Sequence, residues 1–290
     1  MPASPLPAAA PRASLAELVR YFLYLGTFGF GGPVALVGFM HRESFAGTSV
    51  DDREAYATPL GPIPVHTDAV TALLGHPTIH HNEPAHDSAE HSLEVMLPFL
   101  QVALGEFRLV PLLMGSASTD DAEALAGALA SLASQGDYLF IFSTDLSHYH
   151  PDEEARRLDD TTVQAILLET PQAVGRLFAG GALEACGRGP IQASLFLAER
   201  LGYLRRRLLT YAHSGDTTGD RSRVVGYAAI GVYEPPAVLM ERLISPEAGK
   251  ALVAHARGVL QAHFGPADPE PLVPLSEFPD LRQPRGIFVT

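Results

Sequence analysis

The chain has 290 residues, of which 47% are hydrophobic and 18% are charged. This composition suits a globular protein with a sizeable core and excludes a largely disordered chain. The formal net charge is -13, with 33 acidic against 20 basic residues, and it disfavours non-specific binding to nucleic acid or to anionic lipid. The single cysteine, Cys186, excludes an internal disulfide framework and a four-cysteine zinc site, and it fits a reducing cytoplasm.

The N-terminal part is proline- and alanine-rich over residues 1–14 and then becomes apolar. Residues 21–40 contain no charged side chain, and a run of that length spans the hydrocarbon core of a bilayer. The Gly-Gly-Pro at 31–33 would kink or break a simple helix. Two interpretations stay open: membrane association through residues 21–40, or an apolar helix buried in a protein core.

Residues 43–235 have the pattern of one α/β domain. Leu109–Met114 and Tyr138–Phe142 are short apolar runs of buried-strand length. Between them, residues 118–134 predict a helix, because Ser118 or Thr119 can cap it and leucines and alanines recur at helical spacing. A strand, a helix and a strand within about 35 residues predict a parallel crossover unit.

The later elements follow from the same patterns. We predict helices over 153–168 and 191–201 and strands over 208–212 and 224–233. The last strand is nearly all apolar, as expected of a central strand covered on both faces. After Pro235-Pro236, a further helix is predicted from Ser245 to about Gly265.

The most suggestive polar segment is Ser143–Tyr149, which directly follows the strand predicted at 138–142. Ligands bind at the carboxyl ends of strands in open α/β sheets. Asp145 and His148 are three residues apart, so one turn would place them on one face. The carboxylate can then orient the imidazole as a general base or a metal ligand. The alternative is a helix cap with an incidental histidine.

A second candidate is the segment Glu90–Glu94. Ser92 would cap a helix with leucines on its apolar side, and His91 would face a cleft at the helix entrance. The alternative is a surface histidine before a cap. The neighbouring His80, His81 and His86 form a histidine-rich loop, which would either bind metal or be solvated.

Cys186 is the third candidate, because it lies in a glycine-rich turn at a predicted helix start. The helix dipole and Arg188 favour a thiolate there; the alternative is an inert, buried apolar residue. The fourth candidate, His213–Asp220, is interpreted as an ordinary turn between strands. The sequence has no G-x-S-x-G elbow, no P-loop and no G-x-G-x-x-G after a strand, which disfavours a serine hydrolase and a nucleotide-binding protein.

Five ordered motifs resemble the MEMO family, which includes protein B of the bacterial AmmeMemoRadiSam system. They are EHSLEVMLPFLQ, LVPLLMG, STDLSHYH, ACGRGPI and YAHSGDTTGDRSRVVGYAAIG. The resemblance implies an α/β sandwich with a mixed, mostly parallel sheet, similar to the class III extradiol ring-cleavage dioxygenases. It also implies a mononuclear iron or copper site and a metal-dependent, dioxygenase-like oxidoreductase activity on an unidentified substrate.

The same resemblance implies the site residues. Cys186 and His41 correspond to metal ligands, and His148, Asp145 and His91 correspond to catalytic residues around the metal. The family's opening strand, with a P-H-A-G-Y-like motif, has no counterpart in this sequence. We therefore expect a domain that lacks its first strand and leaves a neighbouring strand unpaired.

Both flanks resemble other proteins. The run ELVRYFLYLGTFGFGGPVALVGFMHRE is similar to the opening of chromate transporter family proteins, and Ser245–Thr290 is similar to the start of the AMMECR-type domain, protein A of the same system. We expect a tail and transporter-like segment over 1–42, a MEMO-like domain over 43–235, and a linker with a truncated AMMECR-like segment over 236–290.

The expected partners, by the same resemblance, are protein A and a radical SAM protein. The alternative to a metal-binding enzyme is a non-catalytic chimeric remnant or interaction module. With either function, the chain is expected in the cytoplasm. The other possibility is membrane association through residues 21–40.

Overall fold

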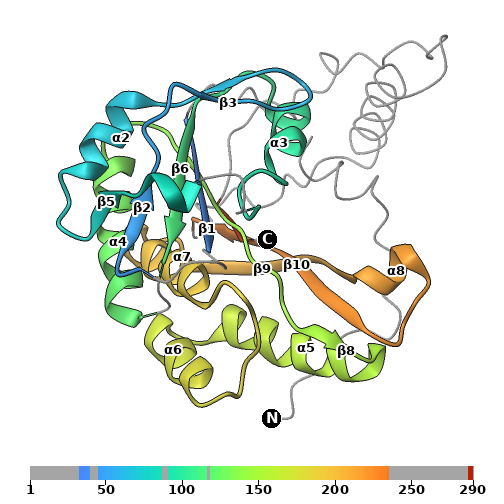
Figure 1. The fold of residues 1–290 in the computed structure, drawn as a ribbon. Coiled ribbons are helices and arrows are strands. Elements are labelled where there is room, and N and C mark those ends of the chain that lie inside the picture. The colour runs from blue at the N-terminus through green and yellow to red at the C-terminus, as the bar shows by residue number, and fades with distance from the viewer. Residues whose placement is uncertain (1–32, 40–44, 87–90, 116–117, 235–286, 290) are drawn as a thin grey trace, which may run out of the picture.

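The computed structural model describes residues 33–39, 45–86, 91–115, 118–234 and 287–289. These residues form a mixed α/β fold around a nine-stranded sheet (Figure 1). The strand order is β5-β2-β6-β1-β7-β11-β10-β8, and β9 also pairs with β10. The four consecutive strands β6, β1, β7 and β11 are mutually parallel, so the centre of the sheet is parallel as expected.

The strands of this sheet are β1 (Val34–Phe39), β2 (Thr48–Val50), β5 (Ile79–His81), β6 (Leu109–Met114), β7 (Leu139–Phe142), β8 (His148–His150), β9 (Arg205–His213), β10 (Val224–Tyr233) and β11 (Ile287–Val289). A separate hairpin pairs β3 (Ala55–Tyr56) with β4 (Ile63–Pro64). The helices are α2 (Thr67–Leu74), α3 (Leu97–Leu104), α4 (Thr119–Ala133), α5 (Asp152–Leu168), α6 (Pro171–Ala179), α7 (Arg188–Leu201) and the short α8 (Ser214–Thr218), with a 3-10 turn, η1, at Glu83–His86.

β1 occupies the middle of the sheet, where it pairs in parallel with β6 on one side and with β7 on the other. Its residues 34–37 are fully buried. The expectation of an apolar helix over 21–40 is therefore wrong for residues 34–39. Pro33 stops a helix from running into them, and a continuous apolar run with β-branched valines suits a strand buried on both faces.

The remainder of that segment, residues 21–32 and 40, lies outside the described residues, as do His41 and the helix predicted over 245–265. Within the described ranges, no helix combines the length and the apolar character needed to cross a bilayer. The expected unpaired strand is not found in the described sheet either. Each strand from β5 to β8 is bonded to the next one in the order, and β11 fills the place between β7 and β10.

The predicted strand–helix–strand unit is confirmed in β6, α4 and β7. The Ser118 side chain caps α4 by accepting a hydrogen bond from the Asp121 N–H at 3.1 Å. β6 and β7 run in the same direction, but β1 lies between them. The helices predicted over 153–168 and 191–201 are α5 and α7, and the two late strands are β9 and β10.

Two local predictions are wrong. Ser92 does not cap a helix: residues 92–96 form a turn, and α3 begins at Leu97. Pro98 has no N–H to donate to a preceding turn, so it favours a helix that starts beside it. The loop predicted after His213 contains the short helix α8.

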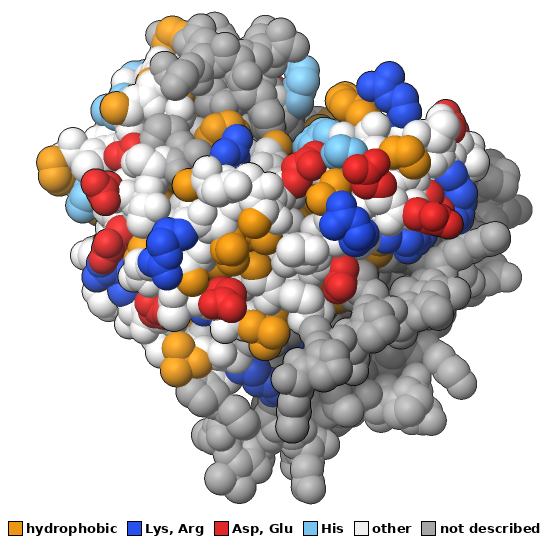
Figure 2. All heavy atoms as spheres, turned by 90° about the horizontal axis from the view of Figure 1, so that it is seen from below, with side chains coloured by type: hydrophobic (Ala, Val, Ile, Leu, Met, Phe, Trp, Pro, Cys, Tyr) orange, Lys and Arg blue, Asp and Glu red, His pale blue; other side chains and the backbone are white. Residues whose placement is uncertain are grey.

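The helices pack on the sheet and on one another. α7 packs against α4, α6, β1 and β7, while α5 lies along β9 and β10 (Figure 1). On the face shown in Figure 2, acidic and basic side chains are interspersed among apolar ones, with no separate field of either sign. The buried residues of β1, β6 and β7 join those of α4 and α7 in one core.

Leu36 offers a direct test of the central position of β1. Replacing this fully buried side chain, Leu36→Ala, is expected to lower the free energy of unfolding by about 2–5 kcal/mol because it leaves a cavity. The matched control is Leu168→Ala, at a side chain that is 75% exposed, which should change stability by less than about 0.5 kcal/mol. Urea unfolding followed by circular dichroism measures both. Equal effects would contradict a buried β1.

Candidate metal centre

The candidate site lies where β7 ends, at the carboxyl end of a buried strand as predicted. The chain leaving β7 runs onto β10: the Leu146 N–H donates to the Gly226 carbonyl at 2.9 Å, and the Gly226 N–H donates to the Ser147 carbonyl at 3.0 Å. β8 continues this antiparallel pairing through His148 and His150. Asp145 and His148 therefore stand on either side of one short backbone junction.

Asp159 of α5 fixes this junction from inside the protein. Its fully buried carboxylate accepts hydrogen bonds from the Ser147 N–H at 2.8 Å and from the Tyr211 hydroxyl at 2.6 Å. Burial and the bond to Asp159 raise the pKa of Tyr211 well above its usual range. A Cβ on Gly226 would lie 1.9 Å from the Asp159 Oδ2, so only glycine allows β10 to approach so closely.

Cys186 comes to the same place from the start of α7, whose N-cap is Gly187. The Cys186 N–H donates to the Asp145 carbonyl at 3.2 Å, and the Asp145 N–H donates to the Cys186 Sγ at 3.2 Å. The Gly187 N–H donates to the Thr144 Oγ1 at 2.8 Å. The sulfur thus faces a backbone N–H at the start of a helix.

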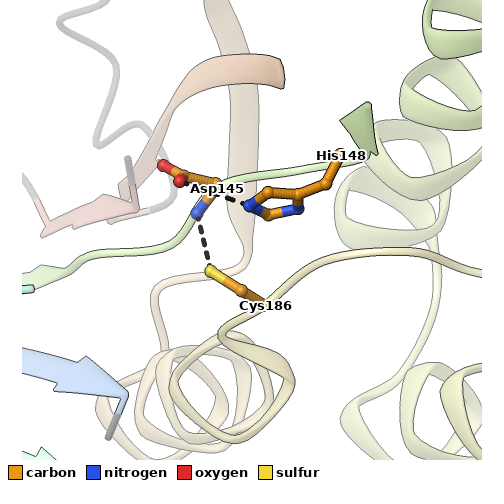
Figure 3. Close-up of side chains that lie close together, drawn as sticks. All are labelled: Asp145, His148 and Cys186. Atoms are coloured by element: carbon orange, nitrogen blue, oxygen red, sulfur yellow. Dashed lines mark hydrogen bonds and ion pairs between the residues drawn. The ribbon is translucent and has the colours of Figure 1, made fainter. Parts of the chain in front are cut away.

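Asp145, His148 and Cys186 form one group (Figure 3). One candidate ligand atom from each lies within 4.8 Å of the others, and the His148 Nε2 is 3.5 Å from the Asp145 carboxylate. The imidazole points toward Asp145, and the sulfur rises toward the Asp145 backbone from the helix start below (Figure 3). All three side chains are partly exposed. Thiolate, imidazole and carboxylate are all transition-metal ligands, so the donor set fits such an ion.

Three of the five predicted site residues are therefore brought together. His91 is not among them: its side chain is 62% exposed, and its Nδ1 lies 3.3 Å from the Glu94 carboxylate. His41 lies outside the described residues, so its role as a ligand stays a prediction.

Comparison with known sequences identifies the family of this chain. Residues 29–231 match the model of the Memo-like protein family. The chain belongs to this family. The match begins before residue 43 and includes β1, so the family-like part reaches into the transporter-like segment. The site residues Asp145, His148 and Cys186 all lie within it.

Three relatives are each described as a MEMO1 family protein. The one from Methanosarcina acetivorans is 38% identical over 223 residues, which are 75% of this chain and 77% of the relative. The one from Ignicoccus hospitalis is 32% identical and covers 72% and 74%, and the one from Aeropyrum pernix is 36% identical and covers 69% and 72%. Among solved structures, an uncharacterized protein of Escherichia coli K12 is similar with a TM-score of 0.46 and 16% identity, over 72% of this chain and 91% of that one.

The sequence analysis missed Glu184, which stands beside the group of Asp145, His148 and Cys186. Its carboxylate accepts the His148 backbone N–H at 3.0 Å and lies 3.0 Å from the His150 Nε2. Its position two residues before Cys186, directly before the motif ACGRGPI, was the available signal. Glu184 therefore fixes the backbone of His148 and pairs with the side chain of His150.

Two tyrosines flank the group on the exposed side. Burial, followed by the charge of nearby Asp145, raises the pKa of Tyr227. Tyr149 has a positive φ of 62°, and the Arg223 guanidinium lies 5.1 Å from its ring centre. A bulky residue in that backbone region is strained, and such strain concentrates at functional sites.

A second group, Asp51, Asp52 and His81, also brings candidate ligand atoms together. Its buried member is already paired, because Asp51 accepts the Tyr56 hydroxyl at 2.7 Å and forms an ion pair with Arg53. A guanidinium on that carboxylate opposes cation binding, and we do not assign a metal there. The neighbouring His86 is buried, with its Nε2 3.0 Å from the Ser49 Oγ. The prediction of a histidine-rich loop is wrong, because His80 and His81 belong to β5 and His86 to η1.

Gly226→Ala tests the junction beneath the site. The added methyl group meets the Asp159 carboxylate, and overpacking of this kind costs about 1–3 kcal/mol of stability. Gly127→Ala in α4 is the matched control, because a Cβ on Gly127 would meet no atom within 4 Å outside its chain neighbours and the nearby backbone of its own helix; helix propensity predicts a gain of about 0.5–1 kcal/mol. Chemical denaturation compares the two. A Gly226→Ala variant as stable as the parent would show that the two elements are not in contact.

His86 makes stability depend on pH. Burial lowers its pKa from 6.5 to about 4, with Asp51 opposing and Arg53 adding to the shift. Between these values the unfolded chain binds a proton that the folded chain does not, so stability falls as pH drops from 6.5 towards 4. The His86→Gln variant should lose less of its free energy of unfolding over this pH range than the parent. The variant His91→Gln, at an exposed histidine, should lose as much as the parent. Urea unfolding at pH 7 and pH 4.5 measures the difference, and parallel curves for parent and His86→Gln would refute it.

Proposed function

We propose that this chain is a metal-binding protein in which Asp145, His148 and Cys186 hold a single transition-metal ion, iron or copper. The observation that carries the proposal is the convergence of three different donor side chains from the end of β7, from β8 and from the start of α7. A thiolate and an imidazole suit iron or copper better than magnesium or calcium, which prefer oxygen ligands alone. His41, by resemblance, is a further ligand.

A bound ion would supply Lewis acidity and a place for a small ligand such as O2. The side chains of the chain itself would do the rest. Asp145, whose carboxylate lies 3.5 Å from the His148 Nε2, would orient the imidazole as a ligand, and the carboxylate oxygen not bound to the ion would accept or donate a proton. Glu184 holds the His148 backbone in place. On the family resemblance, we extend the proposal to a dioxygenase-like oxidoreductase, related to the class III extradiol enzymes, with an unidentified substrate.

Metal content tests the ligand assignment. Protein purified from cells supplied with iron and copper is expected to carry about one equivalent of one of these metals, measured by mass spectrometry of the elements. Cys186→Ser and His148→Gln should each reduce the bound metal at least about tenfold, because each removes one donor. His150→Gln is the matched control: it lies two residues away but pairs with Glu184 and Glu154, and it should keep the metal.

Unchanged circular dichroism spectra would establish that the variants are folded. A parent protein without stoichiometric metal, or a Cys186→Ser variant that keeps it, would overturn the assignment. His91→Gln should keep the metal, because the exposed His91 lies outside the group of three ligands.

The second candidate is a non-catalytic interaction module that docks protein A or the radical SAM protein of the AmmeMemoRadiSam system. Two exposed leucines favour it: Leu168 is 75% exposed and Leu204 is 64% exposed. Arg206 donates to the backbone carbonyls of Ile166 and Glu169, so both leucines lie at the same end of the molecule. A metal-free chain whose binding to protein A is lost in Leu168→Asp would favour this candidate.

A further inference from the structure

Arg223 stands near the candidate metal centre with its charge unbalanced. It directly precedes β10, and its guanidinium lies 5.1 Å from the centre of the Tyr149 ring. Its neighbour Arg221 forms ion pairs with Asp152 and Asp216. Arg223, by contrast, has no carboxylate partner within the described parts of the chain. In a chain with a formal net charge of -13, an arginine without an acidic partner is available to an external anion.

The alternation of β10 brings Arg223 and Tyr227 to the face that carries His148. Val225 lies opposite His148 in the antiparallel pairing of β8 and β10, and directly opposed residues share one face of a sheet. Arg223 and Tyr227 lie two positions to either side of Val225. Both are exposed, whereas the residue on each side of Val225 is buried. The exposed face at this end of β10 therefore presents an arginine and a tyrosine around His148.

Tyr149 connects Arg223 to His148. Its ring lies edge-on to the His148 ring, with the two ring centres 5.8 Å apart, and the Arg223 guanidinium lies over its face. The φ of Tyr149 is 62°, a backbone conformation that asparagine adopts far more readily than a bulky residue. The fold accepts this strain to hold a tyrosine that is 62% exposed. Strain of this kind points to a functional role for the ring.

The stacked guanidinium is prepared for a planar anion. When Arg223 lies over an aromatic face, its N–H groups still point outward in the plane of the fork. Two parallel N–H groups match the two oxygens of a carboxylate, which then binds as a bidentate partner. The Tyr149 ring also fixes the arginine side chain before the ligand arrives, so less rotamer entropy is lost on binding.

The surroundings give such an anion one orientation. Asp145 belongs to the metal group, and Glu154 and Glu184 pair with the last residue of β8. These carboxylates repel an anionic group. Tyr227 keeps its proton, because burial and the charge of Asp145 raise its pKa, so it adds a hydrogen-bond donor and no negative charge. An organic acid at this face is therefore oriented with its anionic end towards Arg223.

We propose that Arg223 recognises the substrate of the candidate metal centre, and that this substrate is a small organic acid whose carboxylate binds the Arg223 guanidinium. Tyr149 is a positioning residue, which holds the guanidinium in place. The reacting part of the acid faces Asp145, His148 and Cys186. The inference rests on the proposed function, because a substrate presupposes a reaction. Binding of the carboxylate itself does not require the metal.

Benzoate serves as the probe, and ligand-observed proton NMR of the full-length protein measures its dissociation constant. Arg223→Gln should raise this constant at least about tenfold, because it removes the charged, bidentate donor. Benzamide, which has the shape of benzoate without its charge, should bind the parent at least about tenfold more weakly. The matched control Arg207→Gln removes the same charge at an exposed position of β9 and should change the constant less than about twofold.

Two variants of Tyr149 test its positioning role. Tyr149→Asn removes the ring at a backbone position that suits asparagine, and it should weaken benzoate binding about threefold. Tyr149→Phe keeps the ring and should bind benzoate as the parent does. Circular dichroism establishes that both variants are folded. Parent-like binding by Tyr149→Asn would overturn the positioning role.

Several outcomes would overturn the recognition of a carboxylate by Arg223. They are parent-like benzoate binding by Arg223→Gln, and no binding of millimolar benzoate by the parent. Arg188, at the start of α7 near Cys186, is the competing cation. A loss in Arg188→Gln equal to that in Arg223→Gln would place the anion elsewhere. Tighter binding of phenyl phosphate than of benzoate would replace the organic acid by a phosphate ester.

Metal content separates this inference from the proposed function. Arg223→Gln should keep the metal of the parent, whereas Cys186→Ser should lose the metal and still bind benzoate. Loss of benzoate binding in Cys186→Ser would place the carboxylate on the ion and overturn its assignment to Arg223. A metal-free parent that binds benzoate through Arg223 would support the carboxylate site and overturn the proposed function.

Discussion

The geometry of the candidate site depends on one backbone junction, the pair of hydrogen bonds that joins residues 146 and 147 to Gly226. The junction is locked by Asp159, a fully buried carboxylate on α5 that accepts bonds from a backbone N–H and a tyrosine hydroxyl. A carboxylate buried to that extent is tolerated only when such bonds are made. The absence of a side chain on Gly226 makes the approach possible. The backbone thus fixes the distance between Asp145 and His148, and this distance brings their side chains together.

A second constraint brings in the sulfur. Cys186 and Asp145 are joined by two hydrogen bonds. The Cys186 N–H donates to the Asp145 carbonyl, and the Asp145 N–H donates to the Cys186 Sγ. The start of α7 is therefore held to the end of β7 before any ligand binds. Three donors from distant parts of the sequence are preorganised in this way, with Glu184 fixing the backbone of His148. Preorganisation of this kind lowers the ordering cost of binding an ion.

The parts of the fold that could be predicted from sequence are those in which local pattern and final environment agree. The β6-α4-β7 unit combines a capping serine, helical spacing and two short apolar runs, and each points to the same structure. The convergence of Asp145, His148 and Cys186 followed from the family motifs, because spacing alone relates only residues that are near in sequence. Asp159 could not be predicted: an acidic residue in a helix rich in charge is typical of a solvated face, and its partners are Tyr211 and a loop N–H far along the chain. β11 is too short to show any periodicity.

β1 shows why an apolar run can be assigned to the wrong structure. A membrane-spanning helix and a strand buried in the centre of a parallel sheet both require uninterrupted hydrophobicity, so composition alone does not distinguish them. The break at Gly31-Gly32-Pro33 and the β-branched valines decide for the strand. Residues 29–40 therefore resemble a transporter segment and also belong to the family match, because both kinds of structure require an apolar run. A central strand demands extended backbone, apolar side chains and fitting volume, and residues 34–37, all fully buried, meet that demand whatever else their sequence resembles.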